Sequence, residues 1–97
     1  MVDPSADGLL STMYYVYVLK NEISNKIYIG QTADISKRLK QHNDKTFDKR
    51  AFTKLNKGSW TLIYKEEFAT RQEAMRREKE LKSSRGRDFI RQTFMDR

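Results

Sequence analysis

The chain has 97 residues, which is enough for one domain with a small core and too few for two independent cores. Charged residues make up 34% of it, and 20 Lys and Arg against 13 Asp and Glu leave a formal net charge of +7, which favours a polyanion or an anionic membrane surface as partner. There is no Cys, which excludes disulfides, thiolate metal sites and cysteine nucleophiles, and no apolar run approaches the roughly 18 residues of a transmembrane helix.

Residues 1–12 precede the first strand pattern and lack the positively charged start of a secretory signal. We expect them to be a disordered leader, followed by one folded domain over residues 13–97. The lack of Cys is consistent with a reducing compartment, so the cytoplasm is the expected location.

The first two predicted elements are strands. Residues 14–19 are aromatic or β-branched except for the last, and residues 26–30 read as a second strand that begins with a lysine and ends in a glycine. The short polar connection between them predicts an antiparallel hairpin. Because side chains alternate between the faces of a strand, Tyr28 should face opposite to Ile27 and Ile29.

The next segment predicts a helix, and a third strand follows. Asp34 is the expected N-cap of a helix that ends near Asn43. Residues 50–55 are expected to add one or two helical turns. Residues 60–66 have the aromatic and β-branched composition of a strand.

Two more helices are predicted in the last third of the chain. Thr70 and Glu73 form a capping box that begins a helix running to Lys82. Residues 83–86 are expected to interrupt it before a last short helix or turn over residues 88–94. The order is then β-β-α-(α)-β-α-α, and its lack of strict alternation predicts an α+β fold.

One carboxylate lies on a helix face that should be buried. Glu78 is four residues after Ala74 and three before Leu81, so the helical turn of 3.6 residues places it between these two apolar side chains. A buried carboxylate is costly unless it is paired or binds a metal. The alternative is a glutamate at the edge of the core, paired with Lys82 one turn later.

The first helix carries a similar pair of polar residues. Ile35 and Leu39 define its apolar face, and His42 continues that face with Arg38 four residues earlier on the same side. The ordinary interpretation of these two residues is a satisfied, half-buried His at a helix end and a surface cation.

These residue types together suit the hydrolysis of phosphodiester bonds. That chemistry needs a divalent cation, a group that deprotonates water, and cations that stabilise the developing negative charge. A single carboxylate can hold Mg²⁺, which takes its other ligands from water and phosphate. A Tyr or His can accept the proton, and an Arg can bind phosphate through two hydrogen bonds.

The ordered set of motifs resembles the GIY-YIG nuclease family, in particular its small single-domain bacterial members. The set consists of Tyr15-Val16-Tyr17, Tyr28-Ile29-Gly30, Arg38 ten residues after Tyr28, His42, and the helix of residues 73–82 that contains Glu78. The resemblance covers about residues 13–92. It implies a three-stranded antiparallel sheet flanked by helices.

The resemblance also implies catalytic roles. Tyr17 and Tyr28 correspond to the two motif tyrosines, one of which helps to activate the attacking water. Arg38 corresponds to the Arg that stabilises the phosphate, and His42 to a position beside the site that is often His in this subgroup.

The remaining site residues follow from the same resemblance. Glu78 corresponds to the metal-binding glutamate, so the implied cofactor is Mg²⁺ or Mn²⁺, and Gly30 is expected to let the backbone turn tightly beside Tyr28. Gln31 stands where some members, such as the excision-repair incision subunit, have a Lys. One positive charge is therefore missing unless Lys37 or another Lys supplies it.

The leading expectation for function is a metal-dependent endonuclease that hydrolyses phosphodiester bonds of DNA or RNA. The alternatives are a nucleic-acid-binding module with little catalysis and a scaffold for another protein that uses the basic residues of 71–91. The expected partner is nucleic acid, DNA first, contacted by Lys37, Arg77 and Lys82. Targeting is left to the shape of the substrate or to a protein partner, and no membrane partner is expected.

Overall fold

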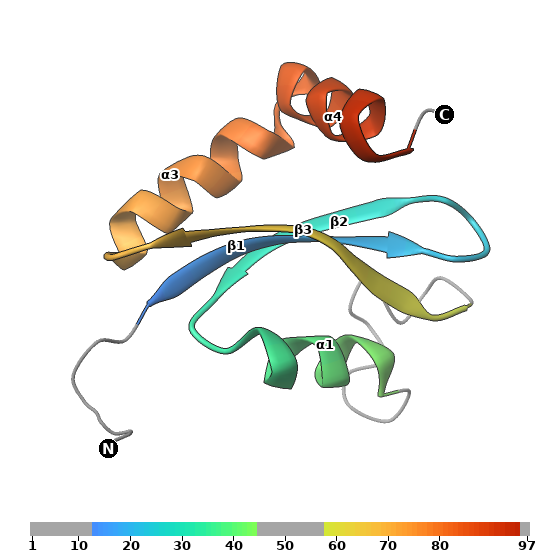
Figure 1. Ribbon diagram of the computed structural model, residues 1–97, viewed down its shortest axis with the longest axis horizontal. Helices are drawn as coiled ribbons and strands as arrows, with labels where there is room; N and C mark the ends of the chain where they lie inside the picture. Colours follow the sequence, from blue (N-terminus) through green and yellow to red (C-terminus); the bar gives the residue numbers. More distant parts are fainter. Residues whose placement is uncertain (1–12, 45–57, 96–97) are drawn as a thin grey trace.

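The computed structural model describes residues 13–44 and 58–95, shown in colour in Figure 1. The elements are β1 (Tyr14–Asn21), β2 (Ile27–Thr32), α1 (Ile35–Asn43), β3 (Trp60–Phe68), α3 (Arg71–Lys82), α4 (Ser84–Ile90) and a π-helical turn, η1 (Arg91–Met95). This order confirms the predicted α+β fold. The predicted leader and the helical turns at residues 50–55 lie outside the described residues.

The three strands form one antiparallel sheet with the order β2-β1-β3, so β1 is central. Each strand continues two residues beyond its predicted end. Polar residues there still pair with a neighbour, as Lys20 does with both Ile27 and Thr61. Side-chain composition predicts which face of a strand is buried, but it does not mark where backbone pairing stops.

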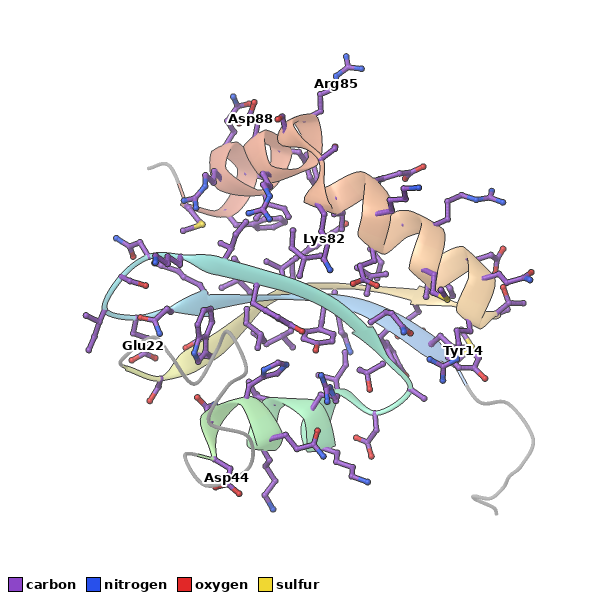
Figure 2. All side chains as sticks on the ribbon, turned by 180° about the vertical axis from the view of Figure 1, so that it is seen from behind. Tyr14, Glu22, Asp44, Lys82, Arg85 and Asp88 are labelled. Carbon is purple, nitrogen blue, oxygen red and sulfur yellow. The ribbon has the colours of Figure 1, made fainter. Side chains whose placement is uncertain are left out.

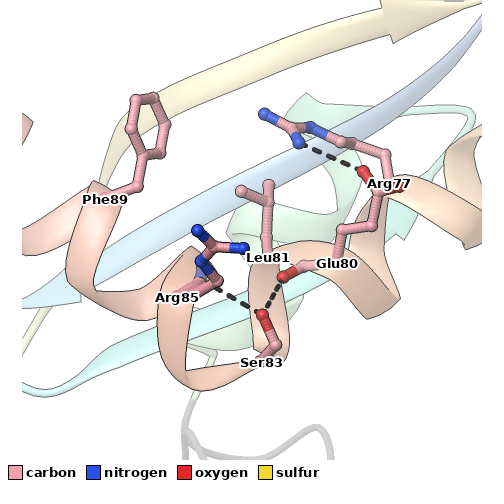
Figure 3. Close-up of a pocket in the computed structure, with 7 residues that line it drawn as sticks. Arg77, Glu80, Leu81, Ser83, Arg85 and Phe89 are labelled. Carbon is pink, nitrogen blue, oxygen red and sulfur yellow. Dashed lines mark hydrogen bonds and ion pairs between the residues drawn. The ribbon is translucent and has the colours of Figure 1, made fainter.

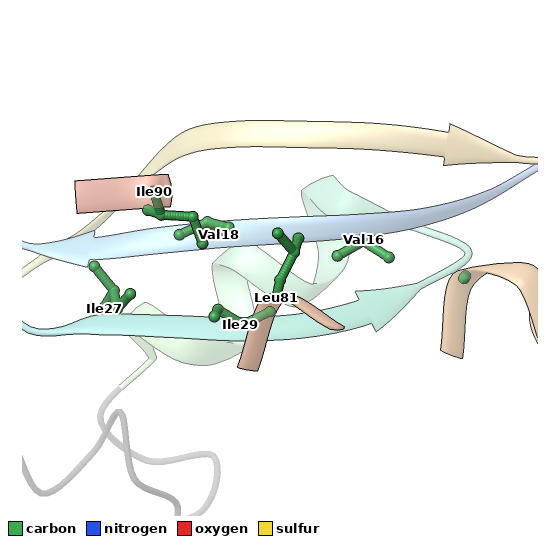
Figure 4. Packing of buried hydrophobic residues seen from close by; sticks show 7 residues of the cluster. Val16, Val18, Ile27, Ile29, Leu81 and Ile90 are labelled. Carbon is green, nitrogen blue, oxygen red and sulfur yellow. The ribbon is translucent and has the colours of Figure 1, made fainter. Parts of the chain in front are cut away.

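The alternation of side chains along β1 divides the core into two layers. Figure 1 shows α1 on one face of the sheet and α3 with α4 on the other. The layer under α3 and α4 is aliphatic and is built around Val16, Val18, Ile27, Ile29, Ala74, Leu81 and Ile90 (Figure 4). The layer under α1 is aromatic and is built around Tyr17, Leu19 and Trp60.

Both predicted helix starts are confirmed. The Asp34 side chain accepts a hydrogen bond from the backbone N–H of Lys37 at 3.0 Å, and Thr70 and Glu73 form the reciprocal capping box. The end of α1 is fixed by Asn43, whose side chain donates to the carbonyl of Trp60 and accepts from its N–H. This pair of hydrogen bonds holds the last turn of α1 against the beginning of β3.

The junction of α3 and α4 differs from the prediction. Residues 83–86 were expected to be an interruption, but Ser83 ends α3 and also caps α4, where its hydroxyl accepts from the N–H of Gly86 (Figure 3). Gly86 therefore lies inside α4. A Cβ at Gly86 would lie 2.3 Å from the carbonyl oxygen of Glu80, so the absence of a side chain lets the two helices meet this closely.

No helix in the described ranges is long and apolar enough to cross a lipid bilayer.

Candidate active site

Three side chains from three elements meet under α1. Tyr17 of β1 and Tyr28 of β2 lie on the same face of the sheet, and His42 of α1 packs over them. The ring centroids of Tyr28 and His42 are 4.6 Å apart, and those of the two tyrosines 6.2 Å apart. Tyr17 Oη and His42 Nε2 are hydrogen-bonded at 2.9 Å. The predicted motif tyrosines and the predicted histidine thus form one contiguous cluster.

Gly30 shapes this cluster by leaving room for a tyrosine ring. It lies within β2, directly opposite Tyr17 in the pairing of β1 and β2. A Cβ at Gly30 would be 2.7 Å from Tyr17 Oη and 3.1 Å from a ring carbon of Tyr28. The expectation of a tight turn is therefore wrong. Gly30 is needed because the phenol of Tyr17 lies across its backbone.

Arg38 joins the cluster from the same helix as His42. Its Nη1 donates to Gln41 Oε1 at 2.9 Å. Although burial alone would lower it, hydrogen bonding to Tyr17 and Tyr28 raises the pKa of Arg38 above its ordinary value. Arg38 is therefore a permanently charged, half-buried guanidinium next to both tyrosines, and the ordinary interpretation as a surface cation is wrong.

Tyr17 is protonated at neutral pH. Its side chain is only 1% exposed, and burial raises its pKa to about 12, against the lowering effect of its hydrogen bond with Arg38. Tyr28 is half-buried, so water reaches it more readily than it reaches Tyr17. The two tyrosines are therefore not equivalent, although the sequence motif treats them alike.

Glu78 lies on α3, which covers the other face of the sheet. Its side chain is 21% exposed, and Oε2 lies 2.7 Å from Nζ of Lys82. The alternative, a glutamate at the edge of the core paired with Lys82, is therefore the arrangement that the structure has, and the metal-binding role of Glu78 stays a prediction. Burial is the largest cause of the raised pKa of Tyr17, and the charge of Glu78 makes the smallest contribution to it.

The described residues can supply only part of a metal coordination shell. Within these ranges no group of three or more His, Cys, Asp and Glu could hold an ion. Glu78 nevertheless fits Mg²⁺ or Mn²⁺, because such ions are commonly bound by one or two carboxylates together with water and substrate phosphate. The pair with Lys82 would have to open for this.

The residues predicted to bind nucleic acid have different surroundings. Arg77 donates from Nε and Nη2 to the carboxylate of Glu66 at 2.9 and 3.1 Å, and from Nη1 to Glu80 at 3.1 Å. Its guanidinium is thus occupied by two carboxylates, as Lys82 is by Glu78. Lys37 is exposed at the first turn of α1.

Arg71 is a residue that the sequence reasoning missed. Its Nη1 donates to Gln31 Oε1 at 3.1 Å, although the two residues are 40 positions apart. The positive charge that Gln31 lacks is thus present at the same place, supplied by an Arg of α3. A signal was available in the sequence, because a cation at the first residue of a helix opposes the helix dipole and calls for an explanation.

Comparison with known proteins identifies a family and several relatives. The family model described as the GIY-YIG catalytic domain matches residues 13–91. UPF0213 proteins of Staphylococcus haemolyticus and Staphylococcus saprophyticus are 37% and 36% identical over 70 residues, which make up 72% of this chain and 80% of each relative. A solution NMR structure of a UPF0213 protein from Bacillus halodurans is 30% identical, covers 80% of this chain and 81% of that one, and superposes with a TM-score of 0.48.

Proposed function

Because the chain belongs to the GIY-YIG family, whose domain is generally a nuclease domain, we propose that it is a metal-dependent endonuclease that hydrolyses phosphodiester bonds of DNA. One observation carries the proposal. Tyr17, Tyr28, Arg38 and His42 come from three elements and form one cluster that contains a permanently charged guanidinium. Packing alone would not favour placing that charge beside two phenols in the aromatic layer of a thin core.

In this proposal Arg38 binds the scissile phosphate. A planar guanidinium can donate two parallel hydrogen bonds to phosphate oxygens, and its partial burial strengthens them. The contact becomes stronger as negative charge develops on these oxygens in the transition state. The neighbouring phenols and Gln41 hold the guanidinium in place before substrate arrives.

The two tyrosines have different roles in this proposal. Tyr17 lies beside Arg38 and shares a hydrogen bond with His42 Nε2, so it positions both residues. Tyr28 is the more accessible phenol and faces the attacking water. His42 contacts both rings and can take up the proton that leaves the water.

Glu78 is the residue that would hold the divalent cation. When bound there, Mg²⁺ or Mn²⁺ lowers the pKa of water and neutralises charge on the phosphate. With the carboxylate engaged in this way, Lys82 would be released from its ion pair and available to the nucleic-acid backbone.

A nucleic-acid-binding module with little catalysis is the second candidate. The pairing of Glu78 with Lys82 favours it, because that ion pair occupies the carboxylate that the metal needs.

One set of incubations separates the two candidates. Single-stranded, duplex and branched DNA and RNA are incubated with the protein and Mg²⁺ or Mn²⁺, beside Glu78→Ala and the matched control Glu67→Ala, which removes an exposed carboxylate of β3. We expect wild type and Glu67→Ala to cut and Glu78→Ala to bind without cutting. Cutting that survives in Glu78→Ala would overturn the assignment of Glu78. Equal binding by all three proteins without any cutting would establish the binding module.

A further inference from the structure

A depression at one end of the sheet adjoins the tyrosine cluster. It has a volume of about 420 Å³, and residues of three elements line it, among them Gln31, Asp34, Lys37, Arg38 and Arg71. Three of these side chains are cations and one is a carboxylate. The Asp34 carboxylate caps α1 through the backbone N–H of Lys37. The lining is therefore electropositive, which suits an anion.

Arg71 is held at this depression by neutral partners. Its guanidinium donates to the amide oxygen of Gln31, and its Cζ lies 4.8 Å from the centroid of the Tyr14 ring. Tyr14 is labelled in Figure 2, at the end of the sheet next to α3. Neither contact neutralises the charge. Arg77, six residues further along the same helix, is instead bound by two carboxylates. The comparison indicates that Arg71 still has N–H groups and an uncompensated charge with which to bind an anion, whereas Arg77 stabilises the fold through its ion pairs.

Arg38 connects the depression to the cluster, because it lines the first and hydrogen-bonds within the second. We propose that Arg71, oriented by Gln31, forms a second phosphate subsite, which binds a phosphodiester of the same nucleic-acid strand beside the one held by Arg38. The proposal rests on the proposed nucleic-acid substrate, but it does not require cleavage. Arg71 thereby sets the path of the strand from the tyrosine cluster towards the start of α3.

The test measures binding without divalent cation, so that catalysis does not enter. Fluorescence anisotropy with a labelled duplex and a labelled single strand is recorded over a range of salt concentrations for wild type, Arg71→Ala, Arg71→Lys and Arg76→Ala. Arg76→Ala is the matched control, because it removes an exposed cation of the same helix that does not line the depression.

We expect Arg71→Ala to weaken binding about 5- to 10-fold and to reduce the log–log salt slope by about 0.9 on duplex or 0.7 on the single strand. Arg71→Lys should keep the slope while losing part of the affinity, because Lys keeps the charge but not the planar fork. Arg76→Ala should stay within about twofold of wild type. A thermal melt by circular dichroism checks that each variant is folded. If Arg71→Ala is not folded, the affinity of Arg71→Lys is used to test the proposal.

Equal weakening by Arg71→Ala and Arg76→Ala would overturn the subsite, because charge alone would then account for both. An Arg71→Lys variant with the wild-type affinity would overturn the role of the guanidinium fork. These results are distinct from the failure of the proposed function. If wild type never cuts but Arg71→Ala binds 5- to 10-fold more weakly than Arg76→Ala, the subsite stands and the endonuclease does not.

Discussion

Tyr17 is the residue on which the contacts of the candidate site converge. It hydrogen-bonds to His42, interacts with Arg38, and covers Gly30 on the neighbouring strand. Its burial explains why a phenol that would titrate near pH 10 in water keeps its proton to about pH 12. A group in this position is better suited to hold neighbours in place than to act as a base at neutral pH.

The raised pKa of Tyr17 predicts a stability change at high pH. The native state keeps a proton that the unfolded state loses above pH 10, so the free energy of unfolding should fall between about pH 10 and 12, by roughly 2–3 kcal/mol in total. Denaturant unfolding at several pH values measures this loss, and Tyr17→Phe should lack it.

Tyrosinate absorbance at 295 nm gives an independent check of the same group. Tyr17→Phe should remove one phenol from the late part of the titration, in which Tyr64 also takes part because burial and Glu66 raise its pKa. Tyr15→Phe removes a phenol outside the cluster and serves as the control. A late part that is unchanged in Tyr17→Phe would contradict the burial of this phenol.

Arg38→Ala should separate catalysis from affinity. Because its contact with phosphate strengthens in the transition state, the single-turnover cleavage rate should fall by about 100-fold or more while the Kd for DNA rises less than 10-fold. Lys40→Ala, which removes an exposed cation from the same helix, is the control. Equal losses in rate and affinity would make Arg38 a phosphate anchor only.

At the scale of elements, the two faces of the sheet carry different groups of residues. The α1 face carries the aromatic cluster, and the α3 face carries the aliphatic core together with Glu78. The ion pair between Arg77 of α3 and Glu66 of β3 fixes α3 on its face of the sheet. Although burial raises it, hydrogen bonds from Arg77 and Tyr64 hold the pKa of Glu66 below its usual value.

The pair predicts how α3 responds to mutation and acid. Arg77→Met should lower the free energy of unfolding by about 1–2 kcal/mol at pH 7, because it leaves a half-buried carboxylate without its cation. The lowered pKa of Glu66 means that this stabilisation is present above about pH 4.5 and is lost as the pH falls and the carboxyl takes up a proton. The cost of Arg77→Met should therefore shrink at pH 3.

Denaturant unfolding of Arg77→Met and wild type at both pH values tests this. Arg76→Met is the matched control, since Arg76 is exposed on the same helix. A cost of Arg77→Met that is the same at pH 7 and pH 3 would show that packing of the Arg77 stem, and not its charge, stabilises the helix.

At the scale of the whole molecule, the cations behind the net charge of +7 have different surroundings. Arg77 and Lys82 are paired with carboxylates, whereas Lys37, Arg38 and Arg71 line one depression. The attraction for a polyanion should therefore be concentrated on the side of the molecule where β2, α1 and the start of α3 meet.

Salt dependence of DNA binding measures this concentration. Three phosphate contacts predict a log–log slope of about −2.7 on duplex DNA, and Lys37→Ala should reduce its magnitude by about 0.9. Arg77→Met should leave the slope unchanged, because its guanidinium is already neutralised. A slope close to zero would favour the alternative of a scaffold for another protein.

Much of the fold could be predicted locally. Strand composition, the two helix caps and the position of His42 relative to Ile35 and Leu39 depend on residues close together in the chain, so a period of two or of 3.6 residues identifies them. The helical period also predicts that Arg38 and His42 share one face of α1, and the strand composition places the motif tyrosines on the hairpin. The GIY-YIG membership that these residues indicated is confirmed.

Other features were decided only by the tertiary structure. Three contacts join residues of different elements: Arg71 with Gln31, Arg77 with Glu66, and the ring of Tyr17 with Gly30. Such contacts depend on strand register and on how each helix lies on the sheet, which no local period encodes. The sequence by itself thus determined the elements and the chemical groups of the site, while packing across the sheet decided which cations are bound by carboxylates and which line the depression beside the tyrosine cluster.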